Sequence, residues 1–130
     1  MDFRYTAEQE AFRSEVRDFI DGVLPSGWFG VDPGPEEEEK EEVHRLAVDV
    51  WRKLGARGWI GLNWPKEYGG QDDPVKDWIL KEELIYWGIP GMDIASVQGD
   101  LILAFGTEEQ KKRFIPPIRR GEVKYAIGMS

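Results

Sequence analysis

The sequence has no cysteine among its 130 residues and a single histidine, His44. Without cysteine the chain has neither a disulfide scaffold nor a thiolate nucleophile, and one imidazole cannot build a histidine-based metal site. No apolar run reaches the roughly 18 residues of a membrane span, and the opening MDFRYTAEQE lacks the apolar core of a signal peptide. We therefore expect a cytoplasmic protein with no membrane segment and no bound metal.

Basic residues are also few relative to acidic ones, so that the formal net charge is −8. Nucleic acid and anionic membranes need a basic face on their partner, so neither is expected to bind. What the chain does have is apolar bulk: 41% of its residues are hydrophobic, including six Trp, four Tyr and six Phe. This content is enough for one folded domain with a genuine core.

Two amphipathic helices are predicted in the first half of the chain. The sequence Thr6-Ala7-Glu8-Gln9 has the pattern of a capping box, which starts a helix, and Pro25 with Gly27 ends it. A second helix follows the acidic run at residues 36–42 and stops at Gly55 or Gly58. Each helix carries one apolar stripe, made of Phe12, Val16, Phe19, Ile20 and Val23 in the first and of Val43, Leu46, Ala47, Val50, Trp51 and Leu54 in the second.

Three more helices are predicted after the loop GWIGLNWPKEYGGQDDP. Asp73 and Pro74 form an N-cap and first-turn pair, and the helix that they start should reach about Trp87 with apolar residues buried on more than one face. Pro90 and Gly91 open a fourth helix, with Ile94, Val97, Leu101 and Phe105 in helical phase. A second capping box, Thr107-Glu108-Glu109-Gln110, starts a fifth helix that Pro116 and Pro117 should end.

No strand is expected before about residue 123, where the ending GEVKYAIGMS becomes extended. The fold class is therefore all-α, a bundle of about five to six helices over residues 1–122. Residues 123–130 form a separate, unfinished element.

Several polar residues are candidates for chemistry, and each has a simpler structural interpretation. His44 is either a general base or a solvated surface histidine, and the second is favoured. The carboxylates at residues 36–39, with Glu41 and Glu42, are more simply a solvated helix start than a cation site. Glu82 falls on the apolar side of the third predicted helix, where a base is conceivable but an ion pair with a neighbouring helix is favoured.

The apolar candidates also have two interpretations each, a ligand-binding one and a core-packing one. Trp59, Trp64 and Tyr68 either stack on a flat ligand or pack in the core. Ile94, Val97 and Leu101 line a pocket between helices or, as we favour from the pattern alone, belong to the core.

Three stretches together resemble the N-terminal helical domain of the acyl-CoA dehydrogenase family. They are FRYTAEQEAFRSEVRDFI, GWIGLNWPKEYGGQ and AFGTEEQKKRFIPPIRRGEVKYAIGMS. The third is the most specific, and the likeness extends over essentially the whole chain, least in the loop at residues 25–35. NWPKEYGGQ and YAIGMS are similar to the branch that acts on bulky acyl-CoAs such as steroid side chains, often as heteromeric assemblies.

The resemblance implies an FAD enzyme that oxidises an acyl-CoA to a 2,3-enoyl-CoA. In that family the flavin accepts a hydride from the β-carbon, a carboxylate removes the α-proton, and electrons pass to an electron-transferring flavoprotein. The helical domain is followed by a β-domain, so residues 123–130 would be its first strand. A homo-oligomer or hetero-oligomer of the full-length chain is expected.

The resemblance also implies roles for particular residues. Ile127, Gly128, Met129 and Ser130 match the start of the flavin-contacting segment, with Ser130 as the hydroxyl position near the ring. On the fourth helix, the positions that match the far end of the acyl pocket are Asp93, Ile94 and Val97. Asp93 is unusual for a purely fatty pocket, which argues against a plain straight-chain substrate.

No catalytic residue is assigned, because the family's catalytic carboxylate lies in the C-terminal domain. We expect this polypeptide alone neither to hold FAD tightly nor to turn over. Two alternatives stay open: a non-catalytic helical binding or regulatory subunit, and a related flavin-dependent acyl-CoA oxidase or monooxygenase.

Overall fold

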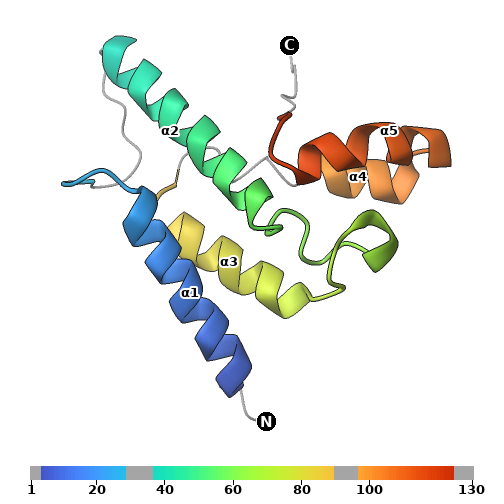
Figure 1. The fold of residues 1–130 in the computed structure, drawn as a ribbon, viewed down its shortest axis with the longest axis horizontal. Helices are drawn as coiled ribbons and strands as arrows, with labels where there is room; N and C mark the ends of the chain where they lie inside the picture. Colours follow the sequence, from blue (N-terminus) through green and yellow to red (C-terminus); the bar gives the residue numbers. More distant parts are fainter. Residues whose placement is uncertain (1–3, 29–36, 90–96, 125–130) are drawn as a thin grey trace.

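The computed structural model describes residues 4–28, 37–89 and 97–124, and these residues are helical with no strand among them (Figure 1). The predicted start of the fourth helix at Pro90 and Gly91 lies outside the described residues, and so does the predicted extended ending from residue 125 onward. The elements are α1 (Ala7–Val23), α2 (Glu37–Ala56), the 3-10 turn η1 (Lys66–Tyr68), α3 (Pro74–Tyr86), α4 (Val97–Phe105) and α5 (Glu108–Arg119). The all-α prediction is confirmed.

The predicted helix starts are confirmed in atomic detail. The Thr6 hydroxyl accepts a hydrogen bond from the backbone of Gln9 while the Gln9 side chain accepts from the backbone of Thr6, and Thr107 and Gln110 repeat this pattern at the start of α5. The Asp73 carboxylate accepts from two backbone amides of the first turn of α3, at 2.9 and 3.1 Å. Each cap pairs amides that the first turn would otherwise leave without a partner.

The predicted end of the fifth helix is wrong, because α5 continues through Pro116 and Pro117 to Arg119. A proline removes a hydrogen-bond donor, but its fixed φ is compatible with a helix. The proline carbonyls still accept bonds from the backbone amides of Arg120 and Glu122, both at 3.1 Å. The buried side chain of Ile118 anchors this last turn in the core.

The helices are arranged as two neighbouring pairs, with α1 beside α3 and α4 beside α5 (Figure 1). The C-terminal end of α2 reaches α5 by a close approach of two backbones. A side chain at Gly55 would collide with the backbone of Arg120, and one at Gly121 would collide with the backbone of Trp51. These two glycines therefore allow α2 to pack directly on the end of α5.

Every helix except α4 contributes fully buried apolar side chains to the core, as does the loop that follows α2, and Ile102 and Leu103 of α4 pack against this core while partly exposed. Trp59 and Trp64 of this loop are buried, so packing, rather than an exposed stacking surface, explains both indoles. Trp59 makes edge contacts with Phe12 and Phe19 of α1, at ring centroid distances of 5.4 Å. The buried apolar side chains are Phe12, Val16, Phe19, Ile20, Val50, Trp51, Leu54, Trp59, Ile60, Leu62, Trp64, Ile79, Leu80, Leu84, Ile89, Ile115 and Ile118.

Burial of α3 on more than one face is also a wrong prediction. Ile79, Leu80 and Leu84 face the core, whereas a second set of apolar side chains is exposed because no described element covers that side of the helix. The exposed set is Val75, Trp78, Ile85, Tyr86 and Trp87.

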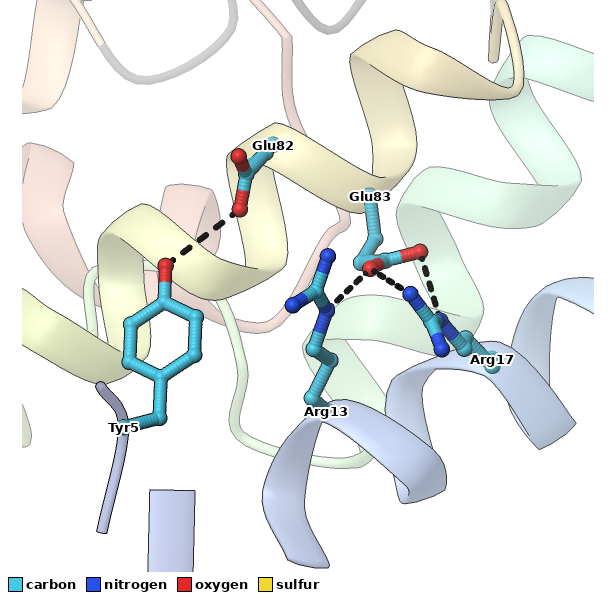
Figure 2. Close-up of polar contacts among 5 residues, drawn as sticks. All are labelled: Tyr5, Arg13, Arg17, Glu82 and Glu83. Carbon is cyan, nitrogen blue, oxygen red and sulfur yellow. Dashed lines mark hydrogen bonds and ion pairs between the residues drawn. The ribbon is translucent and has the colours of Figure 1, made fainter. Parts of the chain in front are cut away.

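A buried ion-pair cluster connects α1 to α3 (Figure 2). The carboxylate of Glu83 is only 4% exposed and accepts from Arg13 Nε at 2.6 Å and from Arg17 Nε at 3.1 Å. Glu82, the residue predicted to occupy this place, is exposed and accepts a 3.3 Å hydrogen bond from the Tyr5 hydroxyl. The predicted ion pair with a neighbouring helix therefore exists, but its carboxylate is the next residue along.

The two arginines determine the protonation of Glu83. Burial by itself would raise the pKa of this carboxyl group, but hydrogen bonds and charge from Arg17 and Arg13 outweigh burial and hold the pKa below its usual range. Glu83 is thus ionised in the folded chain, and its charge favours the folded state.

We predict that Glu83→Gln lowers the free energy of unfolding by about 2 kcal/mol at pH 7, because charge-assisted hydrogen bonds are lost. Since the folded-state pKa is lowered, this stabilisation is complete above the ordinary glutamate pKa of about 4.3 and is lost as the pH falls through the folded pKa. Urea unfolding from pH 7 to pH 3 measures it. The control, Glu82→Gln, should change stability little, and an equal loss in both variants would contradict the assignment.

Among the residues that the structure describes, no helix combines the length and the apolar character needed to cross a membrane.

Candidate functional site

An apolar groove of about 480 Å³ lies between α4 and α5. Its walls come from one side of each helix, and its polar lining is limited to two glutamine side chains and the backbone at Gly106. The lining residues are Gln98, Leu101, Ile102, Phe105, Gly106, Gln110 and Phe114. A groove of this size and composition suits an apolar group such as an acyl chain or a packed helix.

The groove exists because α4 is apolar on nearly all sides but packs against the core on only one of them. Val97 is 39% exposed, Leu101 49% and Phe105 84%. The prediction that Val97 and Leu101 belong to the core is therefore wrong. Leu101 lines the groove, and whether the groove is a ligand pocket stays a prediction. Exposed apolar side chains grouped in this way mark a surface that meets a ligand or another part of a protein.

One polar atom in the groove lacks a partner. Gln98 Nε2 is buried and has no hydrogen-bond acceptor among the described residues. An unpaired buried amide is costly, so an oxygen supplied from outside this part of the chain would stabilise it.

Trp64 fixes the position of α4 relative to the rest of the domain. Its indole Nε1 donates to the carboxylate of Asp100 at 2.7 Å, and its ring is 2% exposed. Side chains at Gly61 or Gly99 would collide with this ring. Sequence reasoning missed the contact, because it joins two residues that lie 36 positions apart.

Of the predicted acyl-pocket and flavin-contacting residues, only Val97 lies within the described part of the chain. Val97 begins α4, one turn before Leu101, and it does not line the groove. Asp93 and Ile94, the other predicted acyl-pocket residues, lie outside the described residues. The predicted flavin-contacting residues Ile127, Gly128, Met129 and Ser130 lie outside them as well.

The remaining polar candidates form no site in the described part of the chain. His44, Glu41 and Glu42 are exposed on α2. No group of three or more histidine, aspartate or glutamate side chains is close enough there to hold a metal ion.

Comparison with known proteins places the chain in a family. The profile of the acyl-CoA dehydrogenase N-terminal domain matches residues 6–122. The chain therefore belongs to the acyl-CoA dehydrogenase N-terminal domain family.

Two curated relatives show which enzymes carry this domain. The acyl-CoA dehydrogenase FadE26 of Mycobacterium tuberculosis is 34% identical over all of this chain and 32% of its own length. A short-chain specific acyl-CoA dehydrogenase of Clostridium acetobutylicum is 32% identical over all of this chain and 33% of its own length. The chain thus spans about one third of these relatives.

Solved structures give the same fold. The ChsE4–ChsE5 complex of Mycobacterium tuberculosis matches with a TM-score of 0.72 and 30% identity, over 95% of this chain and 30% of the other. A steroid acyl-CoA dehydrogenase, Tcur3481–Tcur3483, matches with a TM-score of 0.71 and 30% identity, over 95% and 32%.

We predict that Gly99→Ala destabilises the chain by about 1 to 3 kcal/mol, because the added methyl group collides with the buried ring of Trp64. Gly22→Ala is the matched control: it also lies within a helix, but its methyl group meets nothing within 4 Å. The control should be neutral or stabilising by up to about 1 kcal/mol. Thermal unfolding compares the two variants, and equal effects would contradict the close packing of Trp64 on α4.

Proposed function

We propose that this chain is the N-terminal domain of an FAD-dependent acyl-CoA dehydrogenase that desaturates an acyl-CoA to a 2,3-enoyl-CoA. The observation that carries the proposal is the family match over residues 6–122, supported by 34% identity to a named dehydrogenase over the whole chain. The exposed apolar side of α4 agrees with it, since a wall of an acyl pocket needs apolar side chains that the core does not use.

In this proposal α4 and the residues before it supply one wall of the acyl pocket. Asp93, Ile94 and Val97 would contact the far end of the acyl group, and Leu101 would extend the wall by one helical turn. Val97 at the start of α4 and Leu101 in its middle are both exposed, which leaves both side chains available to contact an acyl group.

The flavin edge would come from Ile127, Gly128, Met129 and Ser130. When bound, FAD supplies the hydride acceptor for the oxidation. This chain contributes position and shape: the backbone near Met129 and the Ser130 hydroxyl would orient the ring, and the catalytic carboxylate would come from outside the chain.

We further propose a bulky acyl substrate and a hetero-oligomeric cytoplasmic enzyme that passes its electrons to an electron-transferring flavoprotein. The structural neighbours support the first two parts, because one is a two-component complex and the other is described as a steroid acyl-CoA dehydrogenase. Asp93 also supports a bulky substrate, because a charged residue is unusual at the end of a pocket for a plain straight-chain acyl group.

The decisive experiment compares the 130-residue chain with a protein extended by the coding sequence beyond Ser130. We expect the extended protein to be yellow and its flavin absorbance to bleach when a bulky acyl-CoA is added without oxygen. The 130-residue chain alone should stay colourless and inactive. A colourless extended protein that forms a stable complex with a second subunit would instead support a non-catalytic helical subunit, and reoxidation by oxygen with peroxide release would support an oxidase.

A matched pair of substitutions in the extended enzyme tests the acyl-pocket wall. Val97→Phe should lower kcat/KM for a steroid-side-chain acyl-CoA relative to a short acyl-CoA by about tenfold, because the larger side chain narrows the pocket. Val75→Phe makes the same change on α3 at similar exposure, 37% against 39%, and should leave the ratio unchanged. An unchanged ratio in Val97→Phe would remove this residue from the pocket.

A further inference from the structure

A second hollow, of about 460 Å³, lies on the opposite side of α5 from the apolar groove, against the turn η1 and Gly69. We propose that this hollow, here named the basic hollow, binds the phosphate group of a nucleotide-sized small molecule. The inference goes beyond the proposed function and does not depend on it. The lining residues are Glu67, Tyr68, Gly69, Glu108, Lys111, Lys112, Ile115, Pro116, Arg119 and Arg120.

The basic hollow concentrates positive charge in a chain whose net charge is −8. Four cationic side chains and two carboxylates line it. Two of the cations already have carboxylate partners: Lys111 Nζ lies 3.1 Å from Glu108, and Arg120 Nε lies 2.7 Å from Glu122. Local attraction for an anion therefore rests on the other two cations, Lys112 and Arg119.

Lys112 and Arg119 have no ion pair within the described residues. They stand two helical turns apart on the same side of α5, with Ile115 and Pro116 between them. Side chains as long as these can reach toward a ligand from both ends of the hollow.

The Arg119 side chain lies against two turns that contain left-handed glycines, Gly58 and Gly69. A side chain on Gly69 would come within 2.7 Å of Arg119 Nε, and one on Gly58 would lie 3.6 Å from a terminal guanidinium nitrogen. Arg119 Nε is itself buried without an acceptor in the described part of the chain. The Arg119 side chain is thus packed against both turns and keeps a donor that a ligand oxygen could accept from.

The rim of the hollow is also organised in advance. The Tyr68 hydroxyl donates to Glu108 at 2.9 Å, and Glu108 in turn accepts from Lys111 at 3.1 Å. The positive charge of Lys111 offsets the negative charge of Glu108, which would otherwise repel an anion. Arginine presents a planar set of donors that matches phosphate, and a nearby lysine adds a compact positive charge.

Titration of the 130-residue chain with inorganic phosphate and, separately, with ADP tests the proposal, followed by amide chemical shifts in NMR spectra. We expect saturable shifts at residues 67–69 and 111–120. Arg119→Ala should weaken binding at least about tenfold, and Lys112→Ala about threefold. Arg113→Ala is the control, because Arg113 stacks on Phe114, outside the hollow, and its removal should leave affinity unchanged.

Arg119→Lys separates recognition by the planar guanidinium from simple charge attraction, and it keeps the test valid should Arg119→Ala fold poorly. We expect this variant to lose most of the affinity while keeping the melting temperature of the parent chain. We expect ADP to bind more tightly than inorganic phosphate, and equal binding of the two would contradict a nucleotide-sized ligand. Shifts that do not saturate, or equal losses in Arg119→Ala and Arg113→Ala, would overturn the proposal.

Discussion

The buried indole of Trp64 is the contact on which the arrangement of the domain depends. It belongs to the loop that follows α2, yet its hydrogen bond ends on Asp100 of α4. Because Gly61 and Gly99 carry no side chains, the ring can lie directly against both segments. One side chain thus joins the loop after α2 to α4, and α4 in turn packs against α5. The groove between α4 and α5 has its position because α4 is held in this way.

The other long-range restraint is polar, and it has a different effect. The ion pairs of Glu83 with Arg13 and Arg17 connect α3 to α1 on the side of α3 that carries the buried residues Ile79, Leu80 and Leu84. The other side of α3 leaves Trp78 and its neighbours exposed. Together with the exposed side of α4, this gives the described part of the chain two apolar surfaces that its own core does not use. Such surfaces are typical of a domain that packs against further protein or ligand.

The sequence predicted well what local rules decide. Capping boxes and apolar stripes gave the starts of α1 and α5 and the core faces of α1 and α2, because both depend on residues a few positions apart. It predicted poorly what the tertiary structure decides. On α3 apolar residues surround most of the helix, so periodicity could not separate Glu82 from Glu83. The contact of Trp64 with Asp100 spans 36 positions, and no local pattern indicates it. The predicted flavin-edge residues stay a prediction.

The buried carboxylates limit what chemistry this chain can perform. Asp77 and Glu83 are the buried acids of the described residues, and each is already paired with a cation: Asp77 with Lys81 at 2.7 Å, and Glu83 with Arg13 and Arg17. A general base that removes an α-proton needs a pKa near the working pH, whereas the arginines lower the pKa of Glu83. Neither of these two buried carboxylates is therefore placed as a free general base. In the proposed desaturation, the carboxylate that removes the α-proton would come from outside this chain.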